Sequence, residues 1–116
     1  MQYPKNDFEI SLEDVSNKLD TDQAFIVLDV REPYEVRMMP MADPRVVNVP
    51  LSQLSASGID VLPEAALNKD QELIVICQEG ARSLSLTTWL RQNGWTNVLS
   101  MQGGMSGFNY MKRKNQ

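Results

Sequence analysis

The sequence has no histidine and a single cysteine, Cys77, among its 116 residues. One cysteine cannot form a disulfide within the chain, which argues against a secreted, disulfide-stabilised scaffold. The same counts exclude a zinc site built from cysteine and histidine. Catalytic Ser–His–Asp triads and Cys–His pairs are excluded as well, because both need an imidazole. Any nucleophilic chemistry at Cys77 must therefore proceed without histidine and without a second thiol.

Long apolar runs and an excess of basic residues are also missing. No stretch approaches the length of a membrane span, and the first ten residues lack the apolar segment of a secretory signal. The formal net charge is -4, which disfavours non-specific binding to nucleic acid or to anionic membranes. We therefore expect a cytoplasmic protein that binds neither nucleic acid nor membrane.

What the chain does have is the size and composition of one globular domain. Its length is close to the commonest domain size, and 42% hydrophobic residues can form a core without disulfides or a structural metal. We expect a single domain over residues 1–116, with the core between about residues 8 and 111. Lys112, Arg113 and Lys114 are expected to form a short basic tail.

Short apolar runs alternate with helical patterns along the chain. Residues 24–30 and 73–77 are continuous, β-branched apolar runs, typical of strands buried on both faces of a parallel sheet. Shorter strand candidates are residues 8–10, 46–50 and 97–100. Helices are expected after Ser11 as N-cap, from Pro33, over residues 63–67 and 83–93, and after Gly103. This order predicts a three-layer α/β/α fold with a mostly parallel central sheet of about five strands.

Three chemically unusual positions follow the predicted strands. Asp29, Cys77 and Gly103 each lie at or just past a strand end. Ligands of parallel sheets bind beyond the carboxyl ends of the strands. We therefore expect the functional site at this edge of the sheet.

Cys77 begins a loop between a buried strand and a helix. The loop residues are Gln78, Glu79, Gly80, Ala81, Arg82 and Ser83. Gly80 permits backbone angles that other residues avoid, so that N–H groups can converge on an anion at the helix N-terminus. A thiolate there gains from the helix dipole and from Arg82, and both effects lower the pKa of a cysteine and favour its reaction at neutral pH. We interpret Cys77 as a partly exposed nucleophile, with a buried structural thiol as the alternative.

Four segments of the chain resemble, in order and spacing, those of single-domain rhodaneses, a sulfurtransferase fold. They are residues 28–35, 48–51, 77–83 and 103–105, and the resemblance extends from about Ser11 to Phe108. It implies a rhodanese-like domain in which the cysteine accepts a sulfane sulfur, holds it as a persulfide and passes it to a nucleophilic acceptor. By position, it implies Cys77 as the nucleophile, Gln78 to Arg82 as the cradle of the persulfide, and Asp29 and Arg31 as its support.

The resemblance also implies the partners of the reaction. No metal or organic cofactor takes part. The donor is a small sulfur compound or a persulfidated protein, and the acceptor is a thiol or cyanide. A carboxylate at Glu79 inside the cradle predicts that thiosulfate, a dianion, is a poor donor, an effect that shrinks if Glu79 faces solvent.

One segment departs from the family pattern, and other functions stay open. Residues 38–45 lack the histidine that many members carry there, and Met38, Met39 and Met41 either form an apolar contact surface or fill the core. A non-catalytic interaction module is the main alternative function. A cysteine-dependent phosphatase or arsenate reductase is disfavoured, because four residues instead of five separate Cys77 from Arg82 and make a smaller cradle.

Overall fold

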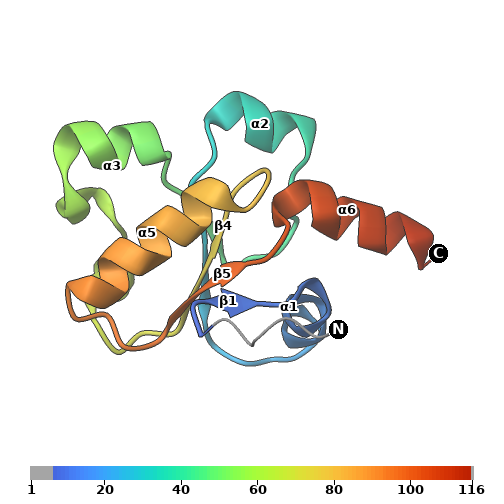
Figure 1. Ribbon diagram of the computed structural model, residues 1–116, viewed down its shortest axis with the longest axis horizontal. Helices are drawn as coiled ribbons and strands as arrows, with labels where there is room; N and C mark the ends of the chain where they lie inside the picture. Colours follow the sequence, from blue (N-terminus) through green and yellow to red (C-terminus); the bar gives the residue numbers. More distant parts are fainter. Residues whose placement is uncertain (1–6, 116) are drawn as a thin grey trace.

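The computed structural model describes residues 7–115, and its centre is one five-stranded sheet (Figure 1). The strands are β1 (Glu9–Ile10), β2 (Ile26–Asp29), β3 (Val46–Asn48), β4 (Leu73–Ile76) and β5 (Val98–Met101). Their order across the sheet is β1-β5-β4-β2-β3, and every neighbouring pair is parallel. The expected parallel sheet is confirmed, and it contains no antiparallel pair among the described strands.

The two central strands are buried on both faces, as their continuous apolar runs predict. All four residues of β4 are at most 1% exposed. Side chains alternate between the faces of a strand, so Val75 joins the core cluster on one side of the sheet and Ile74 joins the cluster on the other. Leu28 and Val27 of β2 divide in the same way. The sheet therefore separates two hydrophobic cores.

Helices cover each core and complete the three layers (Figure 1). One face is covered by α3 (Leu51–Ser57), the 3-10 helix η1 (Ile59–Val61), α4 (Glu64–Leu67) and α5 (Ala81–Gln92). The other face is covered by α1 (Leu12–Leu19) and α6 (Gly104–Lys114). The short helix α2 (Pro33–Met38) follows β2 and buries none of its residues. Within residues 7–115, no helix has the length and apolar character needed to cross a membrane.

Most helices begin where the capping residues and prolines of the sequence predict. Ser11 caps α1 by accepting a hydrogen bond from the Asp14 N–H, with a distance of 3.1 Å. Pro33 occupies the first turn of α2, where Glu32 and Glu35 form a reciprocal capping box. Such caps satisfy backbone N–H groups that have no partner inside the helix.

The main differences from the sequence prediction concern three helices. Helix α5 begins at Ala81 instead of Ser83, because Gly80 adopts a left-handed conformation (φ +104°) and becomes the N-cap. Helix α3 was not expected at all. The three basic residues at 112–114 form the last turn of α6 instead of a tail, where positive charge favours the negative end of the helix dipole.

Candidate active site

The Cys77 loop joins β4 to α5 and rests against the start of α6. The Met105 N–H donates to the Cys77 carbonyl at 2.9 Å, and the Ser106 N–H donates to the Gln78 carbonyl at 3.0 Å. In a trans peptide the carbonyl and the next N–H point in opposite directions. The N–H groups of Gln78 and Glu79 therefore point away from α6.

This contact with α6 requires glycine at its first residue. Gly104 has φ +62°, and a Cβ atom built there would lie 2.4 Å from the Gln78 carbonyl oxygen. No side chain fits at that separation, and the positive φ favours glycine independently. The close approach of Gly104 thus holds the loop peptides in their orientation.

The Cys77 sulfur lies under the loop and makes three hydrogen bonds. Its Sγ accepts from the Gly80 N–H at 3.0 Å and from the Ser83 N–H at 3.3 Å, and its thiol donates to the Ser83 Oγ at 3.2 Å. The N–H groups of four further loop residues have no hydrogen-bond partner within residues 7–115: Gln78, Glu79, Ala81 and Arg82. These N–H groups can bind an anion beside the sulfur.

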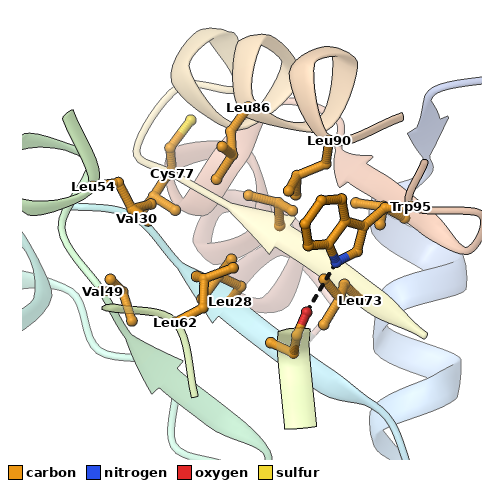
Figure 2. Close-up of a cluster of buried hydrophobic side chains, with 13 residues drawn as sticks. Leu28, Val30, Val49, Leu54, Leu62, Leu73, Cys77, Leu86, Leu90 and Trp95 are labelled. Atoms are coloured by element: carbon orange, nitrogen blue, oxygen red, sulfur yellow. Dashed lines mark hydrogen bonds between the residues drawn. The ribbon is translucent and has the colours of Figure 1, made fainter. Parts of the chain in front are cut away.

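The burial of Cys77 contradicts the expectation of a partly exposed thiol. Its exposed fraction is 1%, and it belongs to the core cluster that contains Val30, Leu54 and Leu86 (Figure 2). The physical reason is the pair of backbone N–H groups at the start of α5, which hold the sulfur beneath the loop. In this conformation almost none of the Cys77 surface is open to a reagent or substrate.

Arg82 was expected to act on the thiolate, but its guanidinium is paired with Glu35 of α2. The two hydrogen bonds from Arg82 Nη1 and Nη2 to the carboxylate measure 2.8 and 2.7 Å. These hydrogen bonds lower the pKa of the Glu35 carboxyl and raise the pKa of the Arg82 guanidinium. The charge of Cys77 raises the pKa of Arg82 in the same direction, but to a lesser extent.

Asp29 and Arg31 form a fully buried ion pair at the end of β2. Both side chains are 0% exposed, and Arg31 Nη2 lies 2.8 Å from Asp29 Oδ2. The remaining guanidinium nitrogen, Nη1, donates to the Met39 carbonyl at 2.8 Å and to Gln78 Oε1 at 3.1 Å. The structure thus places this pair beside the loop, where the resemblance implies that it acts as a support.

The side chains of Gln78 and Glu79 point toward α6 and not toward the sulfur. Gln78 Nε2 donates to Ser106 Oγ at 3.0 Å, and the Ser106 hydroxyl donates to Glu79 Oε1 at 2.8 Å. Glu79 is an exposed residue. Its carboxylate therefore lies outside the cradle, contrary to the expectation from sequence, and its field at the sulfur is weakened by solvent.

The methionine segment divides between core and surface. Met39 and Met41 pack against the core cluster on the α1 and α6 side, and Met39 Sδ accepts a hydrogen bond from Gln78. Only Met38 is strongly exposed, at 84%. Two of the three methionines thus pack against the core, while partly exposed themselves.

Glu35 and Ser100 are among the residues with a place in the site that had no assigned role in the sequence. Glu35 belongs to the segment 28–35 that resembles the family, so a signal for it existed. Ser100 of β5 is 0% exposed and donates to Ser83 Oγ at 2.8 Å. Nothing local marks Ser100, because its partner is 17 positions away in the chain.

Comparison with known proteins gives a family model and several relatives for this chain. The family model of the rhodanese-like domain matches residues 11–110. A Bacillus subtilis protein named as a sulfur carrier is 32% identical over 97 residues, which are 84% of this chain and 48% of the relative. The chain thus spans about half the length of that relative. A sulfurtransferase of Allochromatium vinosum is 28% identical over 97 residues, covering 84% of this chain and 83% of the relative.

A solved structure has a similar fold. A single-domain sulfurtransferase of Saccharomyces cerevisiae superposes with a TM-score of 0.70 at 26% sequence identity. The match covers 95% of this chain and 94% of the yeast chain.

Proposed function

The chain belongs to the rhodanese-like domain family, and from this premise we propose that it is a sulfurtransferase that carries a sulfane sulfur as a persulfide on Cys77. The observation that supports this most is the loop of backbone N–H groups around the Cys77 sulfur. A persulfide anion needs such donors, and it needs neither histidine nor a second thiol. Relatives named as a sulfurtransferase and as a sulfur carrier support the same role.

The proposed cycle has two displacement steps at sulfur. In the first, the Cys77 thiolate attacks the sulfane sulfur of a donor such as thiosulfate or a persulfide. The donor's sulfur–sulfur bond breaks, and sulfite or a thiolate leaves with the electron pair. In the second, an acceptor such as cyanide or a thiolate attacks the outer sulfur, and the Cys77 thiolate leaves. Sulfur is conserved, and no external oxidant or reductant is needed.

The surrounding residues supply positioning and charge balance. The start of α6 binds the loop carbonyls, so that the N–H groups of residues 78 and 79 face away from that helix. The buried Asp29–Arg31 pair holds Gln78, and the Arg82–Glu35 pair holds the start of α5. A site pre-arranged in this way needs little reorganisation when negative charge develops on the sulfur.

A non-catalytic interaction module is the second candidate, and the 1% exposure of Cys77 is the observation that favours it. In that case the cysteine is a structural core residue whose sulfur never reacts. A sulfurtransferase needs a reactive sulfur at Cys77, whereas an interaction module does not. A substitution of Cys77 therefore distinguishes the two candidate functions.

The test measures sulfur transfer by the wild-type chain and by Cys77→Ser. Thiosulfate and a low-molecular-weight persulfide serve as donors, cyanide serves as acceptor, and thiocyanate is the product that is measured. The proposal predicts turnover by the wild type with at least one donor and none by the variant, although the variant stays folded. Equal turnover by both chains would refute it, and a wild type that is inactive with every donor would favour the interaction module.

A further inference from the structure

Three buried hydrogen-bonding groups form a chain from β5 to the Cys77 sulfur. Ser100 Oγ donates to Ser83 Oγ at 2.8 Å, and Ser83 Oγ lies 3.2 Å from the Cys77 Sγ. Ser83 and Ser100 are 0% exposed and Cys77 is 1% exposed. Solvent therefore has little access to this chain, and each hydroxyl depends on its neighbours for hydrogen bonds.

The direction of each hydrogen bond follows from the number of protons. A serine hydroxyl has one proton to donate and can accept two hydrogen bonds. The Ser83 proton goes to the Gly80 carbonyl at 3.1 Å, so both other partners of Ser83 Oγ must donate to it. These donors are the Cys77 thiol and the Ser100 hydroxyl.

Loss of the thiol proton changes this pattern in one place. A thiolate or a persulfide has no proton on Sγ, so the contact with Ser83 Oγ is favourable only if Ser83 becomes the donor. The Ser83 proton must then turn from the Gly80 carbonyl to the sulfur. That carbonyl keeps a second partner, the Leu84 N–H at 3.2 Å, so the change leaves no buried acceptor without a hydrogen bond.

We propose that Ser83 is a reversible hydrogen-bond partner of Cys77 and that Ser100 is the positioning residue that makes it an effective donor. Ser100 donates to Ser83 Oγ in both states, because its only acceptor among the described residues is Ser83. A hydroxyl that accepts a hydrogen bond is a stronger donor than an isolated one. The thiolate and the persulfide thereby gain a third hydrogen bond beside those from the Gly80 and Ser83 N–H groups.

The inference rests on the proposed role of Cys77 as a nucleophile, but its test needs no sulfur donor. The rate of Cys77 alkylation by iodoacetamide is measured against pH in the wild type, in Ser83→Ala, in Ser100→Ala and in the double variant. The charged groups near the loop are Asp29, Arg31, Glu35, Glu79 and Arg82, and none of them changes in this series. Changes in the pH profile therefore report the hydroxyl chain.

We expect Ser83→Ala to move the alkylation midpoint up by about one pH unit, a roughly tenfold slower rate below the midpoint, since a hydrogen bond to a charged group is lost. Ser100→Ala should move it in the same direction by less. Because Ser100 acts only through Ser83, the double variant should match Ser83→Ala. Additive shifts, or an unchanged midpoint in Ser100→Ala, would overturn the proposal.

Thr87→Val is the matched control. Thr87 lies one turn after Ser83 on α5, is 0% exposed, and its hydroxyl has no hydrogen-bond partner within the described residues. Removal of the Thr87 hydroxyl should leave the alkylation profile unchanged. A shift as large as that of Ser100→Ala would show that any change in the buried side chains near α5 affects the cysteine. That result would contradict the proposal. If Ser100→Ala does not fold, Ser83→Ala alone tests the hydrogen bond to the sulfur, and an unchanged midpoint in that variant overturns the proposal. If the alkylation midpoints of the serine variants shift as expected but the wild-type chain transfers no sulfur, the proposed function is refuted while the role of the hydroxyl chain is supported.

Discussion

The guanidinium of Arg82 and the carboxylate of Glu35 are joined by two hydrogen bonds of 2.8 and 2.7 Å, which connect α2 to the first turn of α5. The side chain of Glu35 is 14% exposed and that of Arg82 is 36% exposed. The cation beside the Cys77 loop is thus already balanced by a carboxylate from a different helix. The Arg82–Glu35 pair has no net charge, so its main effect is to fix the position of the Cys77 loop.

Glu35→Gln should lower the free energy of unfolding by at most about 1 kcal/mol at neutral pH, because solvent screens a pair of this exposure. Hydrogen bonds from Arg82, and to a lesser extent from the Glu32 N–H, lower the pKa of Glu35 in the folded chain from its ordinary value of 4.5. Their stabilising effect is present above that ordinary value and is lost as the pH falls through the lowered pKa.

Urea unfolding at neutral and at acidic pH checks this prediction. The difference between wild type and Glu35→Gln should shrink toward zero in acid. Glu64→Gln is the control, since Glu64 is exposed and makes no ion pair among the described residues. A difference for Glu35→Gln that is the same at both pH values contradicts the role of its charge.

Asp29→Ala should destabilise the chain strongly and abolish sulfur transfer. It leaves the Arg31 guanidinium buried without a carboxylate, a change that costs about 3–5 kcal/mol in comparable pairs. The same guanidinium holds Gln78, so the loop loses its support at the same time. Thermal melting and the transfer assay, run below the melting temperature, measure the two effects.

Asp43→Ala is the matched control for this variant. Asp43 and Arg45 have the same spacing in sequence as Asp29 and Arg31 and are 2.8 Å apart, but their side chains are partly exposed. Arg45 binds carbonyls near the end of α1 and none in the Cys77 loop. Asp43→Ala should therefore lose less stability and keep its transfer activity. Normal melting and normal activity in Asp29→Ala would be incompatible with its supporting role.

Gly104→Ala should reduce both stability and sulfur transfer severely. Its Cβ would lie 2.4 Å from the Gln78 carbonyl oxygen and 2.6 Å from the Glu79 nitrogen, so the loop must move. Gly58→Ala separates this contact from backbone strain. Gly58 also has a positive φ, +87°, but a Cβ there meets no atom within 4 Å.

The expected cost of Gly58→Ala is about 1–3 kcal/mol of backbone strain, with transfer activity unchanged. Gly104→Ala should cost more and inactivate the folded fraction. Unfolding free energies and transfer rates of the two variants, measured side by side, test the difference. Equal losses in both would show that the contact with the Cys77 loop has no functional effect.

Glu79→Lys should raise kcat/KM for thiosulfate at low ionic strength by a few-fold only. The carboxylate lies near the loop, but it is exposed and bound to Ser106, so water and salt weaken its effect on a dianion. Glu64→Lys makes the same change in net charge on α4 and should have no effect. The gain for Glu79→Lys should disappear with added salt; a gain that persists at high salt would indicate a change in loop structure instead.

The sequence predicted those parts of the fold that depend on neighbouring residues. The apolar runs in β2 and β4, the cap at Ser11 and the loop at Cys77 are all local patterns. Helix α3 escaped prediction because its sequence, Leu-Ser-Gln-Leu-Ser-Ala-Ser, has only two large apolar side chains and no side-chain cap. Its apolar residue Leu54 becomes significant only when it packs on the sheet.

The site was predictable to the extent that its residues are adjacent in the chain. The Cys77 loop between β4 and α5 follows from adjacent residues, and Asp29 and Arg31 lie beside it, as the resemblance implies. The partners that determine the positions of the side chains are distant in sequence: Glu35 is 47 positions from Arg82, and Ser106 is 27 positions from Glu79. Such pairings depend on the packing of elements, which no local pattern encodes.

The central claim, that Cys77 carries the transferred sulfur, is tested most directly by mass spectrometry of the intact chain. The chain is incubated with thiosulfate or a low-molecular-weight persulfide, freed of donor, and then treated with cyanide. The account predicts a gain of one sulfur atom, located on the peptide that contains Cys77, and its loss as thiocyanate when cyanide is added. A folded wild-type chain that gains no sulfur from any donor, or a Cys77→Ser variant that gains as much as the wild type, would contradict it.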